Sequence, residues 1–135
     1  MFWRFVVIIA VISILVLAGI SCNQDPLINT AYGGAILLTA PAVNENMEID
    51  IPETTFKANE NFYFYFNNNG PFNVDRIEVQ LINSKTGKVL AETDYSVDPQ
   101  SDVVTDMIFF SGPGRFKITV VVNAEVRAIR EVIVE

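Results

Sequence analysis

Hydrophobic and polar residues alternate in short runs through most of the chain after about residue 45. Residues 61–66 place Phe62, Phe64 and Phe66 on one face and two tyrosines on the other. Residues 74–83 and 115–122 alternate in the same way. A period of two predicts strands with one buried face, and no run in this part of the chain has the helical period.

Seven such runs are separated by turn-forming residues. The predicted strands are residues 47–51, 61–66, 74–83, 89–97, 103–110, 115–122 and 126–135. The turn at residues 84–88 makes its two neighbouring strands a hairpin, and the last strand is a candidate free edge for pairing with a partner. A shorter apolar run at residues 35–39 is a further strand or an edge segment. About seven strands with turns every eight to twelve residues predict an all-β sandwich over residues 45–135.

The segment from Gly112 to Val120 begins with Gly-Pro-Gly, and an aromatic residue then opens a strongly alternating strand. This pattern resembles the penultimate strand of immunoglobulin-like and fibronectin type III domains, and the resemblance implies their two-sheet sandwich. The cysteine pair and core tryptophan of antibody domains are absent. Phe116 stands where a corner tyrosine would be.

The N-terminus has a different pattern. Arg4 precedes a largely apolar, uncharged run over residues 5–20, and the small residues Gly19 and Ser21 lie just before Cys22. These are the features of a signal helix cleaved before the cysteine, so residues 1–21 are predicted to be a signal peptide. Two alternatives remain open: an uncleaved signal anchor, since residues 5–24 carry no charge, and simple secretion.

The six residues Leu-Ala-Gly-Ile-Ser-Cys that end at Cys22 resemble a bacterial lipobox. The resemblance implies that Cys22 carries fatty acyl chains and becomes the first residue of a lipoprotein. The sequence departs from the usual pattern at Gly19, where an aliphatic residue is typical. Residues 22–44 are then expected to be the lipidated N-terminus and a tether. Asn23 follows the cysteine, which by the same resemblance favours the outer membrane over the inner one.

The charge balance narrows the range of partners. The chain of 135 residues has a net charge of −7, and Arg4 is the only charged residue before Cys22, so the remainder carries 8 basic and 16 acidic residues. An excess of acids argues against nucleic acid, which requires a basic surface. It also argues against electrostatic docking to anionic lipid, so the membrane attachment is expected to come from the lipid anchor.

Catalysis is not expected, because the chain has no histidine and its single cysteine is assigned to the anchor. We therefore predict a protein that is not an enzyme and has no cofactor or metal. Acidic residues recur every four positions at Asp94, Asp98, Asp102 and Asp106. Ordinary solvated carboxylates are the favoured interpretation, and a calcium site formed by Asp98, Asp102 and backbone carbonyls is the alternative.

Two further features are candidates for contacts. Tyr63 and Tyr65 form either an exposed recognition pair or a pair covered by a neighbouring strand, and residues 67–72 form either a contact loop or a connector. The expected function is a membrane-tethered binding or structural module of the bacterial envelope, with an unidentified protein partner. The alternatives are a signal-anchored subunit of a secretion or assembly complex and a surface protein that binds host or matrix.

Overall fold

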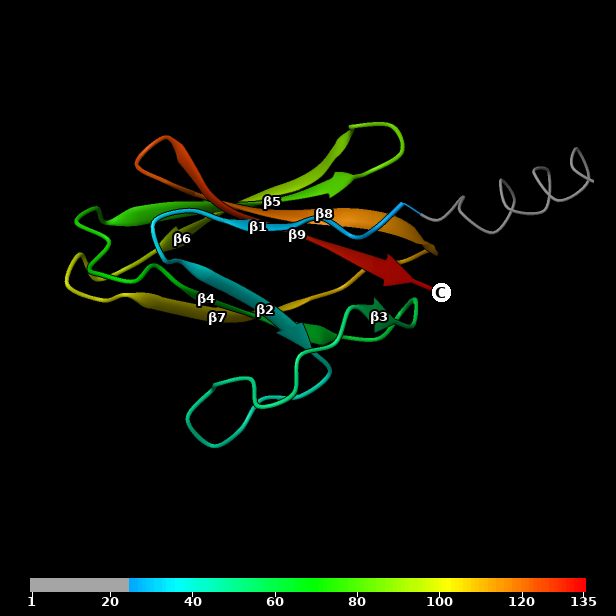
Figure 1. Ribbon diagram of the computed structural model, residues 1–135, viewed down its shortest axis with the longest axis horizontal. Helices are drawn as coiled ribbons and strands as arrows, with labels where there is room; N and C mark the ends of the chain where they lie inside the picture. Colours follow the sequence, from blue (N-terminus) through cyan, green and yellow to red (C-terminus); the bar gives the residue numbers. More distant parts are fainter. Residues whose placement is uncertain (1–24) are drawn as a thin grey trace, which may run out of the picture.

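Two β-sheets packed face to face make up the part of the chain that the computed structural model describes, residues 25–135 (Figure 1). The predicted signal peptide and Cys22 lie outside these residues. Between residues 25 and 135 the chain forms no helix long and apolar enough to cross a bilayer.

The larger sheet has six strands, in the order β1-β9-β8-β5-β6, with β3 added alongside β9 as a parallel strand. Its members are β1 (Asn29–Ala31), β3 (Thr55–Phe56), β5 (Arg76–Asn83), β6 (Val89–Ser96), β8 (Gly114–Val122) and β9 (Glu125–Val134). The smaller sheet has the order β2-β4-β7, and its members are β2 (Ile36–Ala40), β4 (Phe62–Asn67) and β7 (Val103–Ile108). All pairings other than that of β3 with β9 are antiparallel.

The alternating runs from residue 62 onward form strands at their predicted places, including the hairpin of β5 and β6. In β4, Phe62, Phe64 and Phe66 are fully buried, while the tyrosines between them are half-buried on the opposite face. In β8, Phe116, Ile118, Val120 and Val122 are buried as well. The core therefore consists of the inward faces of the two sheets, as the period of two requires.

Four phenylalanine rings stack in a row across the two sheets. The ring centroids of Phe56 and Phe62 lie 4.0 Å apart, those of Phe62 and Phe110 lie 6.0 Å apart, and those of Phe110 and Phe116 lie 4.1 Å apart. Phe116 belongs to β8 and Phe62 to β4, so the row joins the larger sheet to the smaller one. Aromatic side chains bury large areas, and this row therefore fixes one end of the sandwich.

The sandwich begins earlier than residue 45, because part of the expected tether is folded. Residues of β1 pair with β9, and Ile36–Ala40 pairs along its length with β4. Leu37 is buried in the core. The Gly33-Gly34 pair forms a tight turn between the two strands, with both φ angles in the left-handed region at 61° and 78°. These glycines let the chain cross from one sheet to the other.

The predicted strand at residues 47–51 does not form. The Asn44 side chain accepts hydrogen bonds from the N–H groups of Asn46 and Glu48, at 2.9 and 3.0 Å, and closes the segment into a loop. Met47 has a φ of 59°, which no strand tolerates. Ile51 remains 75% exposed. The structure thus contains nine strands in its described part: this run is lost, β1 and β3 are gained, and the apolar run at residues 35–39 forms β2, as one of its two interpretations predicted.

The last strand is also not an edge. It lies between β8 on one side and β1 and β3 on the other, so its backbone groups are already paired. The outermost strands of the larger sheet are β1, β3 and β6, and those of the smaller sheet are β2 and β7.

Polar contacts join the two sheets at their margins. Arg130 of β9 is 5% exposed, and its Nε donates to the Thr39 hydroxyl of β2 at 2.8 Å. Arg127 donates from Nε to the Asn68 side chain at 3.0 Å, and the Tyr95 hydroxyl of β6 donates to Asp106 of β7 at 2.7 Å. Burial lowers the pKa of Arg130, and burial together with the Asp106 contact raises the pKa of Tyr95. These bridges set how the sheets lie over one another.

We predict that Phe64→Ala lowers the free energy of unfolding by about 3–5 kcal/mol, because it leaves a large cavity at a fully buried position. Chemical denaturation of the full chain measures this change. Phe109→Ala is the matched control: its ring is 50% exposed, and we expect a loss below about 1 kcal/mol. Equal losses for the two variants would contradict the packing described here.

Candidate functional site

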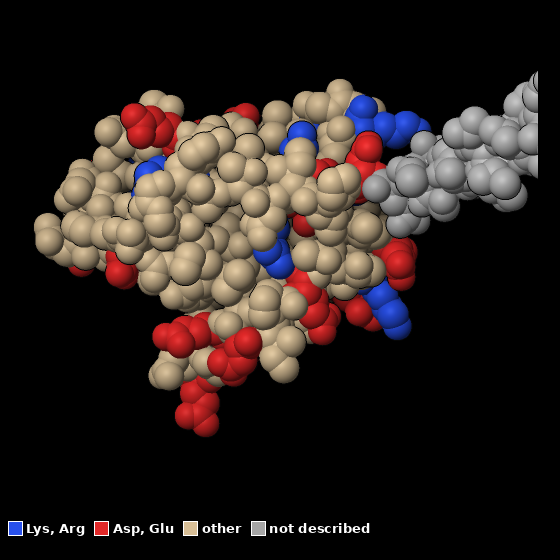
Figure 2. Space-filling model, viewed as in Figure 1, with Lys and Arg blue, Asp and Glu red and all other residues tan. Residues whose placement is uncertain are grey.

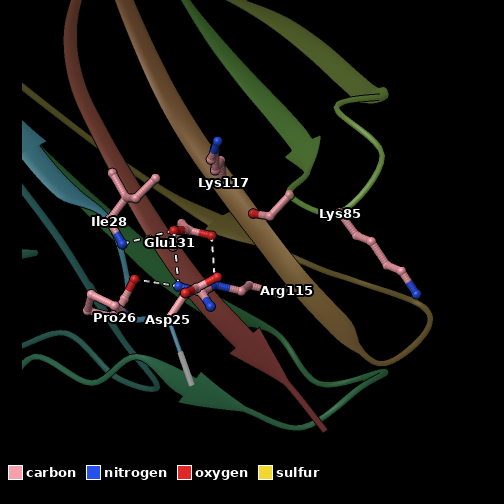
Figure 3. Close-up of a pocket in the computed structure, with 8 residues that line it drawn as sticks. Asp25, Pro26, Ile28, Lys85, Arg115, Lys117 and Glu131 are labelled. Carbon is pink, nitrogen blue, oxygen red and sulfur yellow. Dashed lines mark hydrogen bonds and ion pairs between the residues drawn. The ribbon is translucent and has the colours of Figure 1, made fainter. Parts of the chain in front are cut away.

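An ion pair on the outer face of the larger sheet holds the first described residues against the sandwich (Figure 3). Arg115 of β8 donates from Nε to Oε2 of Glu131 on β9 at 2.8 Å, and from Nη2 to Oε1 at 3.3 Å. The Glu131 side chain is 3% exposed, whereas that of Arg115 is 30% exposed. This two-point contact is the strong form of an arginine–carboxylate pair.

Both members of the pair also bind the backbone of the incoming chain. The N–H of Ile28 donates to Oε1 of Glu131 at 2.9 Å, and Arg115 Nη2 donates to the carbonyl of Pro26. The N–H of Glu131 in turn donates to the carbonyl of Ile28 at 2.7 Å. We call these four residues, Pro26, Ile28, Arg115 and Glu131, the N-terminal clamp. The clamp fixes the point at which the chain enters the fold.

Strand register brings the two charged residues together. In the ladder of β8 and β9, Lys117 pairs with Glu131, and Arg115 pairs with Ile133. Arg115 and Glu131 are therefore diagonal neighbours on one face of the sheet, a distance that a long side chain spans. The basic pair of Arg115 and Lys117 is visible in the sequence, but the role of Glu131 depends on this register.

The contacts of Glu131 outweigh the cost of burying its charge. Burial by itself raises the pKa of Glu131, but the Ser84 hydroxyl, the Ile28 N–H and Arg115 together lower that pKa below its ordinary value. The Ser84 oxygen is buried and close to the carboxylate, yet it makes no hydrogen bond of ordinary geometry in the described structure. The ionised form of Glu131 is the one that the fold stabilises.

A hollow of about 510 Å³ opens beside the clamp. The residues that line it are Asp25, Pro26, Ile28, Ser84, Lys85, Arg115, Lys117 and Glu131. Its volume lies within the range of small-molecule sites. Lys85 comes from the turn between β5 and β6, so the hollow collects side chains from that turn, from β8 and β9, and from the entering chain (Figure 3).

The regularly spaced aspartates do not come together. Asp94 is exposed on β6, and Asp106 on β7 accepts the Tyr95 hydroxyl. In the loop between these strands, Asp98 accepts the backbone N–H of Gln100 at 2.9 Å. In residues 25–135 no three acidic, histidine or cysteine side chains converge in a way that could hold a metal ion.

The loop at residues 67–72 is a structural connector. Phe72 is buried and lies with its ring centroid 6.3 Å from that of Phe66. Asn68 accepts from Arg127 through both its side-chain oxygen and its backbone carbonyl, each at 3.0 Å. This loop is therefore occupied by contacts within the sandwich.

Tyr63 and Tyr65 lie on the outer face of the smaller sheet, half-buried between β2 and β7. Tyr63 pairs with Ala40 and Met107, while Tyr65 pairs with Leu38 and Thr105. The neighbouring strands cover the edges of the rings and leave part of each ring at the surface. Cys22, the predicted lipidation site, lies outside the described residues. No known protein family and no curated protein sequence matches this chain.

We predict that the advantage in stability of the natural protein over Glu131→Gln decreases as the pH falls below 4.5, the ordinary pKa of a glutamate. Because the pKa of Glu131 is lower in the folded state than in the unfolded state, ionised Glu131 stabilises the fold at pH values above its unfolded-state pKa. This contribution is lost as the pH falls through the folded-state pKa. Near pH 7 we expect Glu131→Gln to cost about 1–3 kcal/mol.

Unfolding free energies measured at a series of pH values provide the check. Glu125→Gln is the matched control, because Glu125 is exposed at the start of the same strand. If Glu131→Gln and Glu125→Gln gave the same pH profile, the clamp would not depend on the charge of Glu131.

Proposed function

We propose that this protein is a lipid-anchored, non-catalytic binding module of the bacterial envelope, with an immunoglobulin-like or fibronectin type III-like sandwich. Three connections support an immunoglobulin-like or fibronectin type III-like sandwich, because each crosses from one sheet to the other. They are β4 to β5, β6 to β7 and β7 to β8. Such crossovers are the Greek-key connections of that class. Fold class alone does not give function, so the proposal depends on a surface.

The proposal rests on the outer face of the smaller sheet, which has no charged side chain. The outward positions of the smaller sheet are Ile36, Leu38, Ala40, Tyr63, Tyr65, Asn67, Val103, Thr105 and Met107. None of these nine side chains is charged. Ile36 and Met107 are 48% and 51% exposed, and most of the others are half-buried. We call this surface the uncharged face.

The outer face of the larger sheet has the opposite character. Glu78 and Asp94 lie directly opposite each other there, and Arg115, Lys117 and Glu131 occupy the neighbouring strands. A protein normally keeps charges on a solvated sheet face. Depletion of charge with enrichment in tyrosine and methionine is typical of the centre of a protein–protein interface.

Acidic residues border the uncharged face on one side. The loop between β2 and β3 carries Glu45, Glu48 and Asp50, and it projects at the bottom of the view in Figure 2. The Thr105 hydroxyl of the uncharged face donates to the carbonyl of Met47 in this loop at 3.1 Å. An apolar centre with an acidic rim favours a protein partner whose own contact surface is apolar with a basic rim.

The anchor part of the proposal combines the lipobox resemblance with the position of the clamp. Pro26 is held on the sandwich four residues after Cys22. Four extended residues reach about 14 Å. Acyl chains on Cys22 would therefore hold the domain close to the bilayer, and two or three chains make a lasting anchor. By the same resemblance, the proposed location is the outer membrane.

We predict that protein extracted from membranes lacks residues 1–21 and carries the added mass of acyl chains. Intact mass spectrometry of the natural protein and of Cys22→Ala measures this, and the variant should lose the added mass. A full-length, unmodified mass would contradict the lipid anchor and favour the alternative of a signal-anchored subunit of an envelope complex.

A second prediction concerns the uncharged face. A photo-crosslinking amino acid at Ile36 should give a discrete adduct in living cells, whereas the same amino acid at Glu92 on exposed β6 should not. Met107→Lys, which places a charge beside the partner, should reduce the Ile36 adduct at least fivefold while the unfolding free energy stays within about 0.5 kcal/mol.

The matched control is Thr93→Lys, an exposed change on β6. An Ile36 adduct that survives Met107→Lys unchanged would exclude the uncharged face as the binding surface. Protease treatment of intact cells then distinguishes a protein on the cell surface from one that faces the periplasm. A host- or matrix-binding surface protein is cut, whereas an inward-facing module is protected.

A further inference from the structure

We infer that the hollow beside the N-terminal clamp binds the phosphodiester headgroup of an anionic phospholipid. This inference rests on the proposed function, because it takes Cys22 to lie at a membrane surface. Phosphodiesters carry a single negative charge, and the side chains around the hollow suit such a group.

Two lysines of the hollow have no acidic partner. Lys85 and Lys117 both line it, and within residues 25–135 the ion pair of Arg115 with Glu131 is the only one closer than 4.0 Å. Lys85 is exposed and Lys117 is half-buried. Neither ammonium group is therefore held by a carboxylate. Figure 3 shows the Lys85 side chain extended away from Arg115 and Glu131, so its ammonium group reaches an anion in the hollow after rotation about its side-chain bonds, which its exposure permits.

The charge of the hollow contrasts with the charge of the whole chain. Arg115 and Glu131 neutralise each other, and Asp25 offsets one of the two lysines, which leaves one net positive charge. The chain as a whole has a net charge of −7, from which no electrostatic docking to anionic lipid is expected, and the inference departs from that expectation because the hollow has a charge of the opposite sign. Basic side chains also gather over the turn between β5 and β6, at the upper right of Figure 2, where Lys88 follows Lys85. An anion is thus attracted to this end of an otherwise acidic molecule.

The single excess charge is balanced by one monoanion. A phosphodiester keeps one negative charge across the physiological pH range, which matches the hollow. Free phosphate near pH 7 is a mixture of monoanion and dianion, so charge does not separate the two ligands, and competition with inorganic phosphate distinguishes them.

Position favours a lipid as the source of the phosphodiester. Asp25, which lines the hollow, is three residues after the predicted acylation site. A domain held this close to a bilayer meets headgroups at high effective concentration. Weak binding by two lysines is then sufficient to set which end of the sandwich contacts the membrane.

The test uses the full chain in lipid nanodiscs. One set contains only phosphatidylcholine, and the other also contains phosphatidylglycerol with a spin label on its headgroup. We expect enhanced relaxation of the Ser84 and Lys85 amide signals with the labelled anionic lipid. Lys85→Gln combined with Lys117→Gln should reduce this enhancement at least fivefold. Lys57→Gln is the matched control, because Lys57 lines a different hollow.

Three results would overturn the inference. The first is equal enhancement in the double variant and in Lys57→Gln. The second is the same enhancement from a spin label on phosphatidylcholine. The third is a shift of the same signals by inorganic phosphate as strong as that by glycerophosphoglycerol. The last result would identify free phosphate as the ligand.

A separate titration tests the hollow in protein that lacks the lipid anchor. Glycerophosphoglycerol, the soluble headgroup, is titrated into Cys22→Ala protein in detergent. Binding that Lys85→Gln with Lys117→Gln abolishes would support the hollow even if intact mass showed no acylation, whereas absent binding would overturn it even if Cys22 were acylated.

Discussion

The packing of phenylalanine rings between two sheets is the interaction on which this structure depends. A chain with a single cysteine has no internal disulfide to hold its sheets together. Burial of apolar area must supply the cohesion instead, and β4 contributes three consecutive inward phenylalanines to it. The row from Phe56 to Phe116 then extends the contact to β3 and β8. The surface features of the protein are arranged on strands that this core fixes.

The polar contacts between the margins of the two sheets affect the fold differently from the aromatic core. Burying Arg130 next to a hydroxyl and a carbonyl, rather than a carboxylate, costs desolvation free energy that neutral partners only partly offset. Such a contact adds little to stability, but it is satisfied in one alignment of β2 against β9. The Arg127 and Tyr95 bridges act in the same way at other margins. We infer that these polar contacts select one alignment of the two sheets among several that the apolar core alone would permit.

Sequence periodicity predicts the strands that have a continuous apolar face of their own. The faces of β4, β5 and β8 follow directly from alternation, because one side of each strand is apolar. The short strands β1 and β3 have no such pattern and exist because β9 offers free backbone groups beside them. The opposite error occurs at residues 47–51, where alternation is present but the Asn44 side chain closes a loop first. The clamp also escapes prediction, since Glu131 is one acid among sixteen until register places it beside Arg115.

The N-terminal clamp has a mechanical consequence. Any tension that arrives along the chain from the direction of residue 24 meets Pro26 and Ile28 first, and these are held by side chains rooted in two central strands. The three-residue ladder of β1 on β9 is the next element to bear the load. The phenylalanine core lies behind both. A pull on the chain from this side would therefore strain the clamp and β1 before it disturbed the sandwich, and in the proposed lipid-anchored form these contacts would protect the core from movements of the membrane.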